Sequence, residues 1–245
     1  MDLSKILGVL LVLLSILFLS LQFQAYEIEA TGIKALALIS LTSLYALTVK
    51  HKHPLFFGFL IVFTMGEIFN YITWVVNFDP DPYFDYFYYI NNTLYIIAYT
   101  LLIFRILVGI NIVNTIKKLP LQTLLLLGLS VFTVYIITGT AEKELSALEY
   151  NFELMYNAVL MFLMCLSLVN YMNKDNRKSM NLLIGSICIV FSETLQLAFY
   201  YISEENIINL LCSMFFVAAF LFFYLQSRLL PKQLETLEQH QELNT

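Results

Sequence analysis

Charge is scarce in this sequence, and its scarcity argues against a soluble protein. Only 13% of the 245 residues are Asp, Glu, Lys or Arg, about half the ~25% that is typical of soluble domains. Hydrophobic residues make up 60%, more than a core of this size needs, so the excess must face lipid. Little sequence is left between the apolar runs for a separate soluble domain. The composition therefore predicts a multi-pass membrane protein.

Cysteine and histidine are also few, and this excludes several kinds of site. The three cysteines, each inside an apolar run, give neither a disulfide framework nor zinc-ligand spacing, and we interpret them as packing residues. No histidine falls within an apolar run, which argues against Ser-His-Asp catalysis. His51 and His53 have lysine neighbours that repel a metal cation. With no glycine-rich phosphate loop and no nucleic-acid surface, we predict no metal, no cofactor and no nucleic-acid partner.

Eight apolar runs are long enough to cross a bilayer as helices, which takes about 20 residues. They lie at residues 6–23, 33–49, 55–76, 91–110, 121–139, 150–171, 180–201 and 207–229. The first run is too long for the ~7–15-residue core of a signal peptide. We therefore predict an all-α, polytopic membrane helical bundle with eight transmembrane helices over residues 1–229. Residues 230–245 are predicted to form a short cytoplasmic tail, interpreted as a solvated end.

Lysine and arginine are segregated to one side of the predicted membrane. Of the 13 basic residues, 11 fall on the side that carries both termini. They are Lys5, Lys50, Lys52, Arg105, Lys117, Lys118, Lys174, Arg177, Lys178, Arg228 and Lys232. The other side carries most of the acids and includes segment 77–89, predicted as an acidic, aromatic loop that its prolines keep out of a helix. The positive-inside rule then makes both termini cytoplasmic, in the cell or inner membrane.

A weak internal similarity links the third and seventh spans. Gly58, Val62, Phe63 and Glu67 resemble Gly185, Val190, Phe191 and Glu193, with one residue fewer between the glycine and the glutamate. Because these runs are four spans apart, the two halves would share one orientation, as a parallel 4+4 pseudo-repeat. Chance matching is the alternative, since Leu-, Ile- and Phe-rich sequences often resemble one another.

Two carboxylates, Glu67 and Glu193, lie in the middle of apolar runs. Each is followed by polar or aromatic residues on the same helical face: Asn70, Tyr71 and Trp74 after Glu67, and Gln196 and Tyr200 after Glu193. Both lie 12 residues beyond the start of a span, at Leu55 and Asn181, which is about 18 Å along a helix. An ionised carboxylate at that depth costs at least ~2.5–3.5 kcal/mol, so we expect both to face a wet cavity or the bundle interior.

Further polar residues collect in the same outer half of the predicted bundle. The second span begins near Lys34, the fourth presents Asn92, Tyr95 and Tyr99 on one face, and the sixth presents Glu153 and Asn157. Two carboxylates with a lysine suit general acid–base hydrolysis. They also suit proton-coupled transport or an amine site. The third interpretation is a buried hydrogen-bond network that holds the bundle together without chemistry.

At these residues the chain resembles the YhhN-type integral-membrane lysoplasmalogenases, which have eight spans. The family motifs are Lys-Pro in span two, Gly-Asp in span three, His-x-x-Tyr in span four and Ser-Asp in span seven. The corresponding pairs here are Lys34-Ala35, Gly66-Glu67, Asn92-x-x-Tyr95 and Ser192-Glu193. Their order covers nearly the whole chain, and each pair departs from the family pattern by one residue.

The resemblance implies hydrolysis of the vinyl-ether bond of a lysophospholipid, with a membrane lipid as the partner. One of Glu67 and Glu193 would protonate the vinyl ether and the other would activate water, without an assignment of which does which. The candidate substrate-binding residues are Lys34, Asn70, Tyr71, Asn92, Tyr95, Glu153, Asn157, Gln196 and Tyr200. Each Asp-to-Glu change adds a methylene, and a shift of about 1 Å can cost ~10²-fold in rate, so the substrate can differ.

Two other classes of function stay open at this point. One is a small-solute or proton-coupled transporter, which a parallel repeat would suit. The other is a non-catalytic membrane sensor or scaffold whose tail contacts a protein partner. The hydrolase interpretation also requires that the third and seventh spans be neighbours, and helical periodicity alone does not identify neighbours.

Overall fold

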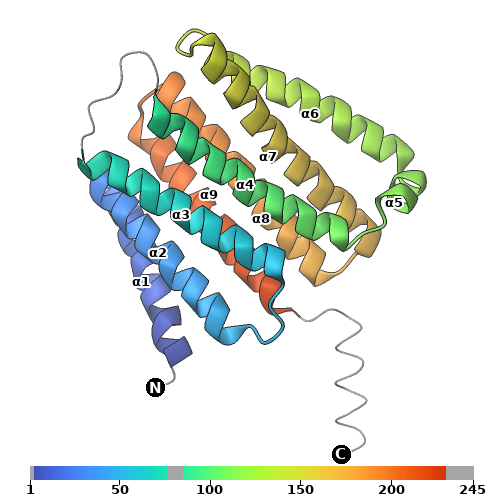
Figure 1. Cartoon of the computed structure of the whole chain (residues 1–245), viewed down its shortest axis with the longest axis horizontal. Coiled ribbons are helices and arrows are strands. Elements are labelled where there is room, and N and C mark those ends of the chain that lie inside the picture. The colour runs from blue at the N-terminus through green and yellow to red at the C-terminus, as the bar shows by residue number, and fades with distance from the viewer. Residues whose placement is uncertain (1–2, 77–84, 230–245) are drawn as a thin grey trace, which may run out of the picture.

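The computed structural model describes residues 3–76 and 85–229, and within these ranges the chain forms nine α-helices and no strand (Figure 1). The helices are α1 (Leu3–Phe23), α2 (Glu27–Thr48), α3 (Pro54–Val76), α4 (Tyr86–Val108), α5 (Ile112–Lys118), α6 (Pro120–Thr140), α7 (Ala147–Lys174), α8 (Arg177–Tyr201) and α9 (Asn206–Arg228). All except the short α5 are long and apolar enough to cross a membrane. The predicted all-α polytopic bundle is confirmed, and the chain is an integral multi-pass membrane protein.

Two helices, α2 and α4, begin five or six residues earlier than the apolar runs indicate, more than the other spans do. Helix α2 begins at Glu27 and not at residue 33, so Lys34 lies two turns inside the helix and not at its start. Helix α4 begins at Tyr86 because the Asp85 side chain caps it, accepting a hydrogen bond from the backbone N–H of Tyr88 at 3.0 Å. The end of the predicted 77–89 loop is therefore helical. Residues 77–84 and the predicted tail, residues 230–245, lie outside the described ranges.

The helices pack in the order of the chain within each half. Contacts run from α1 through α2 and α3 to α4, and from α6 through α7 and α8 to α9. The two halves meet where α4 packs on α7 and where α1 packs on α9 (Figure 1). Helices α1 and α6 are the most exposed of the eight long helices, and their apolar side chains would face lipid. The predicted pseudo-repeat stays a prediction.

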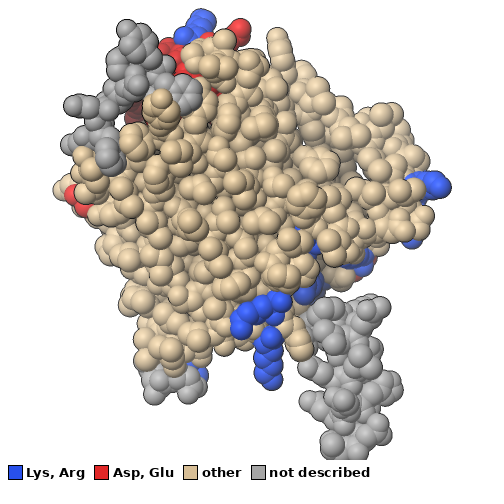
Figure 2. Space-filling view, viewed as in Figure 1, with Lys and Arg blue, Asp and Glu red and all other residues tan. Residues whose placement is uncertain are grey.

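Charged side chains gather at opposite ends of the bundle (Figure 2). The basic end is where α2 and α4 finish and α3 and α8 begin, and it carries Lys50, Lys52 and Arg177. The acidic end is where α2 and α4 begin, and it carries Glu27 and Asp85. The structure thus keeps the charge segregation that the sequence indicates for the two sides of a membrane.

Between the two ends, phenylalanines from α3 and α9 form an aromatic layer. It consists of Phe56, Phe59, Phe63, Phe216, Phe220 and Phe223, all of them buried. The Phe59 and Phe220 rings stack with centroids 6.0 Å apart, and Phe63 meets Phe220 edge-on at 4.8 Å. Polar residues lie on both sides of this layer in the chain: His53 directly precedes α3, and Glu67 follows the last phenylalanine that α3 contributes to the layer. The layer therefore divides the polar interior into two parts.

Gly185 on α8 packs tightly against α9, and it supports a prediction about stability. A Cβ atom at this position would lie 2.6 Å from Cδ1 of Phe223 and 3.2 Å from the carbonyl oxygen of Ala219. Because Phe223 is fully buried, it has no room to move aside. We expect Gly185→Ala to lower the free energy of unfolding by about 1–3 kcal/mol, measured by denaturant titration in detergent. Gly128→Ala is the control, since nothing lies within 4 Å of its Cβ position; equal stability of the two variants would contradict this packing.

The turn between α2 and α3 gives a second prediction, about pH. The backbone N–H of His53 donates to the hydroxyl of Tyr45 at 3.1 Å, which holds this half-buried histidine in place. Burial, with the nearby positive charges of Arg105 and Lys178, lowers the pKa of His53 below its ordinary value of 6.5. The unfolded chain therefore binds a proton on His53 more readily than the folded one does. We expect thermal stability to fall as the pH drops through and below 6.5.

The measurement is the unfolding midpoint at pH 7.5 and pH 5.5 for the wild type, His53→Asn and His51→Asn. His53→Asn should show the smaller decrease on acidification, because the group responsible has been removed. His51, exposed in the same turn, is the matched control. An unchanged pH dependence in His53→Asn would rule out this histidine as the source.

Candidate functional site

The polar side chains of the outer half meet in one cavity of about 500 Å³ at the acidic end. We call it the carboxylate cavity; helices α2, α3, α4, α7 and α8 all contribute to its walls. Its lining includes Lys34, Glu67, Asn70, Trp74, Asp85, Tyr88, Asn91, Asn92, Tyr95, Glu153, Tyr156, Asn157, Glu193, Gln196 and Tyr200. Residues that are far apart in the chain thus share one polar space inside a largely apolar bundle.

Glu67 forms a buried ion pair with Lys34. The Nζ atom of Lys34 lies 2.7 Å from Oε1 of Glu67, and the two side chains are 15% and 1% exposed. The same Nζ atom lies 4.1 Å from the centroid of the Phe216 ring, a cation–π contact that further holds it in place. Oε2 of Glu67 has no hydrogen-bond partner within the described ranges. One oxygen is therefore anchored, and the other can accept a bond from a ligand or water.

The glycine before Glu67 has a packing role. A Cβ atom on Gly66 would lie 3.0 Å from Cε1 of Tyr95, so the missing side chain lets the Tyr95 ring approach α3. Tyr95 in turn packs against Phe63, with ring centroids 5.0 Å apart. These contacts place the base of the carboxylate cavity directly on the aromatic layer. The Gly66-Glu67 pair thus combines close packing with a buried charge.

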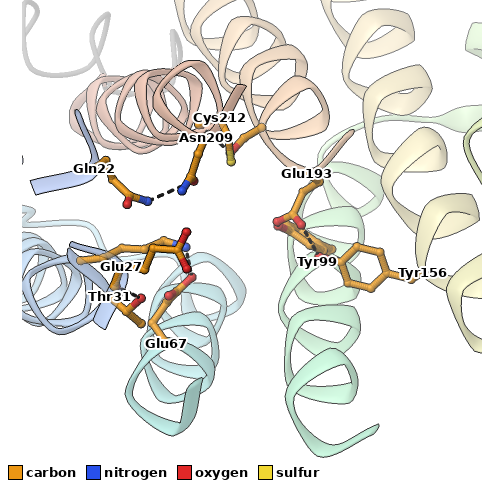
Figure 3. Close-up of polar contacts among 11 residues, drawn as sticks. Gln22, Glu27, Thr31, Glu67, Tyr99, Tyr156, Glu193, Asn209 and Cys212 are labelled. Carbon is orange, nitrogen blue, oxygen red and sulfur yellow. Dashed lines mark hydrogen bonds and ion pairs between the residues drawn. The ribbon is translucent and has the colours of Figure 1, made fainter. Parts of the chain in front are cut away.

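Glu193 has different partners, two tyrosine hydroxyls. Tyr99 donates to Oε1 at 2.5 Å and Tyr156 donates to Oε2 at 2.8 Å, and both rings are buried (Figure 3). The preceding residue, Ser192, donates to the carbonyl oxygen of Cys212 on α9 at 2.9 Å. Ser192 therefore faces α9 while Glu193 faces α4 and α7. Among the described residues, Glu193 makes no ion pair with a cation.

A third carboxylate, Glu153, lies nearer the acidic end of the same cavity. Its oxygens accept hydrogen bonds from the hydroxyl of Tyr88 at 3.0 Å and from Nδ2 of Asn157 at 3.1 Å. The Asn157 amide also donates to Oγ1 of Thr138 at 3.2 Å, which ties α7 to α6. The glutamate and the asparagine are four residues apart, so they lie on one face of α7. Both oxygens of Glu153 are engaged, unlike those of Glu67.

Nine of the predicted site residues other than Glu67 line this cavity, and one does not. Tyr71 was predicted to share the face of Glu67, but its ring packs against Gly32 on α2, where an added Cβ would lie 2.8 Å from Cε2. At 3.6 residues per turn, Asn70 and Tyr71 point about 60° and 40° to opposite sides of Glu67. Asn70 therefore faces the cavity, whereas Tyr71 faces α2 and is absent from the cavity lining; its role in substrate binding stays a prediction.

The hydrogen bonds between Glu193 and two tyrosines were not predicted from the sequence. Tyr99 was placed on the cavity face of the fourth span, but its bond to Glu193 was not predicted, and Tyr156 was not named at all. A signal for Tyr156 was present, because it follows Glu153 by three residues and shares its helical face. The third and seventh spans, which the hydrolase interpretation required to be neighbours, do not pack side by side: α3 packs on α2 and α4, and α8 packs on α7 and α9. Glu67 and Glu193 nevertheless line the same cavity.

An apolar groove adjoins the carboxylate cavity at Lys34. It has a volume of about 300 Å³ and lies between α1, α2 and α9. Its lining includes Leu11, Ile16, Leu38, Leu41, Val217 and Phe220, and Lys34 is the one charged residue among the described residues that line it. A polar crevice of about 50 Å³ also reaches Lys34, beside the hydrogen bond from Gln22 to Asn209 at 3.2 Å (Figure 3). A ligand with one polar and one apolar end would fit this combination of spaces.

The described residues hold no group of three or more His, Cys, Asp and Glu that could bind a metal ion. The three cysteines are buried and free, in agreement with their interpretation as packing residues. The groups available for chemistry in the carboxylate cavity are thus carboxylates, tyrosine hydroxyls, amides and one ammonium. This set can accept and donate protons and can orient a polar head group.

Comparison with protein-family models, with curated proteins and with solved structures finds no match to this chain. The resemblance to lysoplasmalogenases therefore rests on the four short motifs, whose Lys34, Glu67, Asn92, Tyr95 and Glu193 all line the carboxylate cavity.

Proposed function

We propose that this protein is an integral-membrane hydrolase of a lysophospholipid, acting on a vinyl-ether bond, with Glu67 and Glu193 as its acid–base pair. The observation that carries the proposal is that a buried carboxylate, Glu67, and a half-buried one, Glu193, line one cavity with different partners, next to an apolar groove that shares Lys34 with it. A hydrogen-bond network that only stabilised the bundle would not need an adjoining groove. The proposed location is the cell or inner membrane, with both termini cytoplasmic as the charge segregation indicates.

We assign the two carboxylates by their partners. Glu67 has one oxygen paired with the Lys34 ammonium and the other without a hydrogen-bond partner within the described ranges, so it is the proposed general base. Glu193 accepts hydrogen bonds from two tyrosine hydroxyls and has no cation bonded to it in the described part of the chain, and it is the proposed general acid. Pairs of carboxylates held in different environments are how acid and base roles are separated in hydrolases.

The proposed chemistry uses each proton once. Glu193 transfers its proton to the second carbon of the vinyl ether, and the positive charge that forms on the first carbon is shared with the ether oxygen. Glu67 takes a proton from water, whose oxygen bonds to the first carbon and forms a hemiacetal. The bond from that carbon to the glycerol oxygen then breaks; Glu67 gives its proton to the glycerol oxygen and Glu193 takes the hemiacetal proton. An aldehyde and a glycerophospho head group leave, and both residues return to their starting states.

The cavities fit the two ends of such a lipid. The apolar groove of about 300 Å³ would take the hydrocarbon chain, and the carboxylate cavity of about 500 Å³ would take the head group. Asp85 and Glu153 line the outer part of the carboxylate cavity with Tyr88, so a cationic amine on the head group would meet carboxylates and an aromatic ring there. A zwitterionic lysophospholipid is therefore the proposed substrate class.

One observation favours a second candidate, a transporter. A further cavity of about 1000 Å³ lies at the basic end, so polar spaces occur on both sides of the aromatic layer. Alternating access would open one and then the other. This candidate predicts solute movement into liposomes without cleavage of any lipid.

The test is mass spectrometry of a lysophospholipid panel incubated with purified protein in detergent. The panel contains vinyl-ether, ester and saturated-ether lipids with the same head group. We expect free aldehyde from the vinyl-ether lipid and no product from the saturated ether, which cannot form the same cation. A folded protein that releases no product from any member would remove the hydrolase proposal for this class.

A further inference from the structure

The cavity at the basic end has a strongly one-sided charge. We call it the basic cavity; it is lined by the α2–α3 turn, the ends of α4, α7 and α9, and the start of α8. Its lysines and arginines are Lys50, Lys52, Arg105, Lys174, Lys178 and Arg228, and two histidines join them. Its lining, which consists of described residues, includes no Asp or Glu. Lys and Arg side chains also lie along this end in Figure 2.

Arg105 lies in the wall of the basic cavity and is incompletely bonded. Its Nη2 atom donates to Oε1 of Gln226 at 3.3 Å, and among the described residues it makes no ion pair. Its Nε atom is buried without a hydrogen-bond partner, as is Nε2 of Gln226, whose side chain is fully buried. Buried donors are normally bonded, so two such donors beside one cavity indicate a missing acceptor.

The positive-inside rule accounts for lysines and arginines in cytoplasmic loops, but it does not account for the cations that line the basic cavity. That rule concerns lysines and arginines that reach cytoplasmic water or lipid head groups. Arg105 instead enters the bundle between α4 and α9 and bonds a fully buried amide. Lys174 approaches from α7, with Nζ 3.2 Å from the Cβ position of Gly109 at the end of α4. Cations brought together from separate helices repel one another unless an anion lies between them.

The size and charge of the basic cavity define the kind of anion. A volume of about 1000 Å³ is at the upper end of the ~300–1000 Å³ range of ligand sites and exceeds the needs of a single small ion. Several ammonium groups with one planar guanidinium suit a phosphate, which carries up to two negative charges and several acceptor oxygens. A carboxylate would leave most of these donors without a partner.

We propose that the basic cavity binds a phosphate-bearing anion, either a lipid phosphomonoester head group or a soluble phosphorylated molecule, with Arg105 and Lys174 as its main ligands. The proposal does not depend on the hydrolase proposal, because the basic cavity is separated from the carboxylate cavity by the aromatic layer. The lowered pKa of His53, caused partly by Arg105 and Lys178, reflects the same positive field.

The experiment is native mass spectrometry of the full chain in detergent, with two probes. One is glycerol 3-phosphate, as a soluble phosphomonoester, and the other is phosphatidic acid, as a lipid phosphomonoester; the adduct mass identifies which one binds. We expect one tightly held copy, and Arg105→Gln and Lys174→Gln should each weaken it by about 10- to 100-fold, the size of one charged hydrogen bond. Lys117→Gln, at an exposed lysine of the same end outside the cavity, is the matched control.

The outcomes separate the sources and the alternatives. Adducts with glycerol 3-phosphate that either cavity variant weakens support a soluble ligand; adducts with phosphatidic acid alone, weakened in the same way, support a lipid. If Arg105→Gln does not fold, Lys174→Gln decides the result. Absence of both adducts overturns the proposal, and so does an equal loss in Lys117→Gln, which would indicate attraction to the charged end as a whole.

Discussion

The Glu67→Gln variant is expected to lower kcat for vinyl-ether cleavage by about 10²–10⁴-fold, the usual contribution of a general base. Glutamine has nearly the same shape and can still accept a hydrogen bond from Lys34, whose Nζ lies 2.7 Å from Oε1 of Glu67. It cannot take a proton from water. The oxygen proposed to take the proton is Oε2, which is buried and has no hydrogen-bond partner among the described residues. Aldehyde release by mass spectrometry measures the effect.

The control for this prediction is Glu204→Gln. Glu204 is an exposed carboxylate between α8 and α9 at the acidic end, outside the lining of the carboxylate cavity. The same chemical change there should leave kcat near that of the wild type. Both variants should elute as folded protein; Glu204→Gln should unfold like the wild type, whereas Glu67→Gln leaves Lys34 without its carboxylate and should be less stable. Turnover by a folded Glu67→Gln at the wild-type rate would exclude Glu67 as the base.

The Lys34→Met variant is expected to lower the free energy of unfolding by about 3–5 kcal/mol, the cost of breaking a buried ion pair by removing one partner. Met is similar in length and keeps the apolar stem, so the loss comes from the charge. Glu67 is only 1% exposed and would be left without its cation. The double variant Lys34→Met/Glu67→Gln removes that unpaired charge, so it should be more stable than Lys34→Met alone. Denaturant titration in detergent of the wild type, Lys34→Met, Glu67→Gln and the double variant gives the coupling energy between Lys34 and Glu67.

Lys143→Met is the matched control for the ion pair. Lys143 is an exposed lysine in the segment between α6 and α7, and it lies at the same end of the bundle. Its replacement should change stability by no more than about 0.5 kcal/mol, as is usual for surface positions. If Lys34→Met were as stable as Lys143→Met, or if the double variant were no better than the single one, the ion pair would not contribute as described.

The membrane class, the eight spans and the charge segregation could all be predicted from the sequence. In lipid, every backbone polar group must be bonded within the segment, so an apolar run of sufficient length has few alternatives to a helix. The helix ends were less accurate because local capping decides them. Asp85 starts α4 within a segment whose composition indicated a loop. The length of an apolar run predicts the part of a helix that lies inside lipid. It does not predict the polar first turns that extend beyond the lipid.

The candidate site could be predicted in part. Periodicity placed Glu67, Asn70 and Asn92 correctly toward a common interior, because a polar face on an apolar helix has few other places to lie. It could not supply the partners of Glu193, since Tyr99 and Tyr156 come from two other helices. Residues that share one face of a helix still point in directions that differ by tens of degrees. The position of the neighbouring helix decides which of them pack against it and which face the cavity. Tyr71 lies on the edge that α2 covers at Gly32.

The central claim, that two carboxylates of one cavity hydrolyse a vinyl-ether lipid, is tested most directly by running the reaction in D₂O and analysing the aldehyde by mass spectrometry. Protonation of carbon by Glu193 predicts one deuterium on the carbon next to the carbonyl, with product formation about 10²–10⁴-fold slower in Glu193→Gln. An intact substrate with folded wild-type protein, or an unlabelled aldehyde, or equal rates in the wild type and Glu193→Gln, would contradict it.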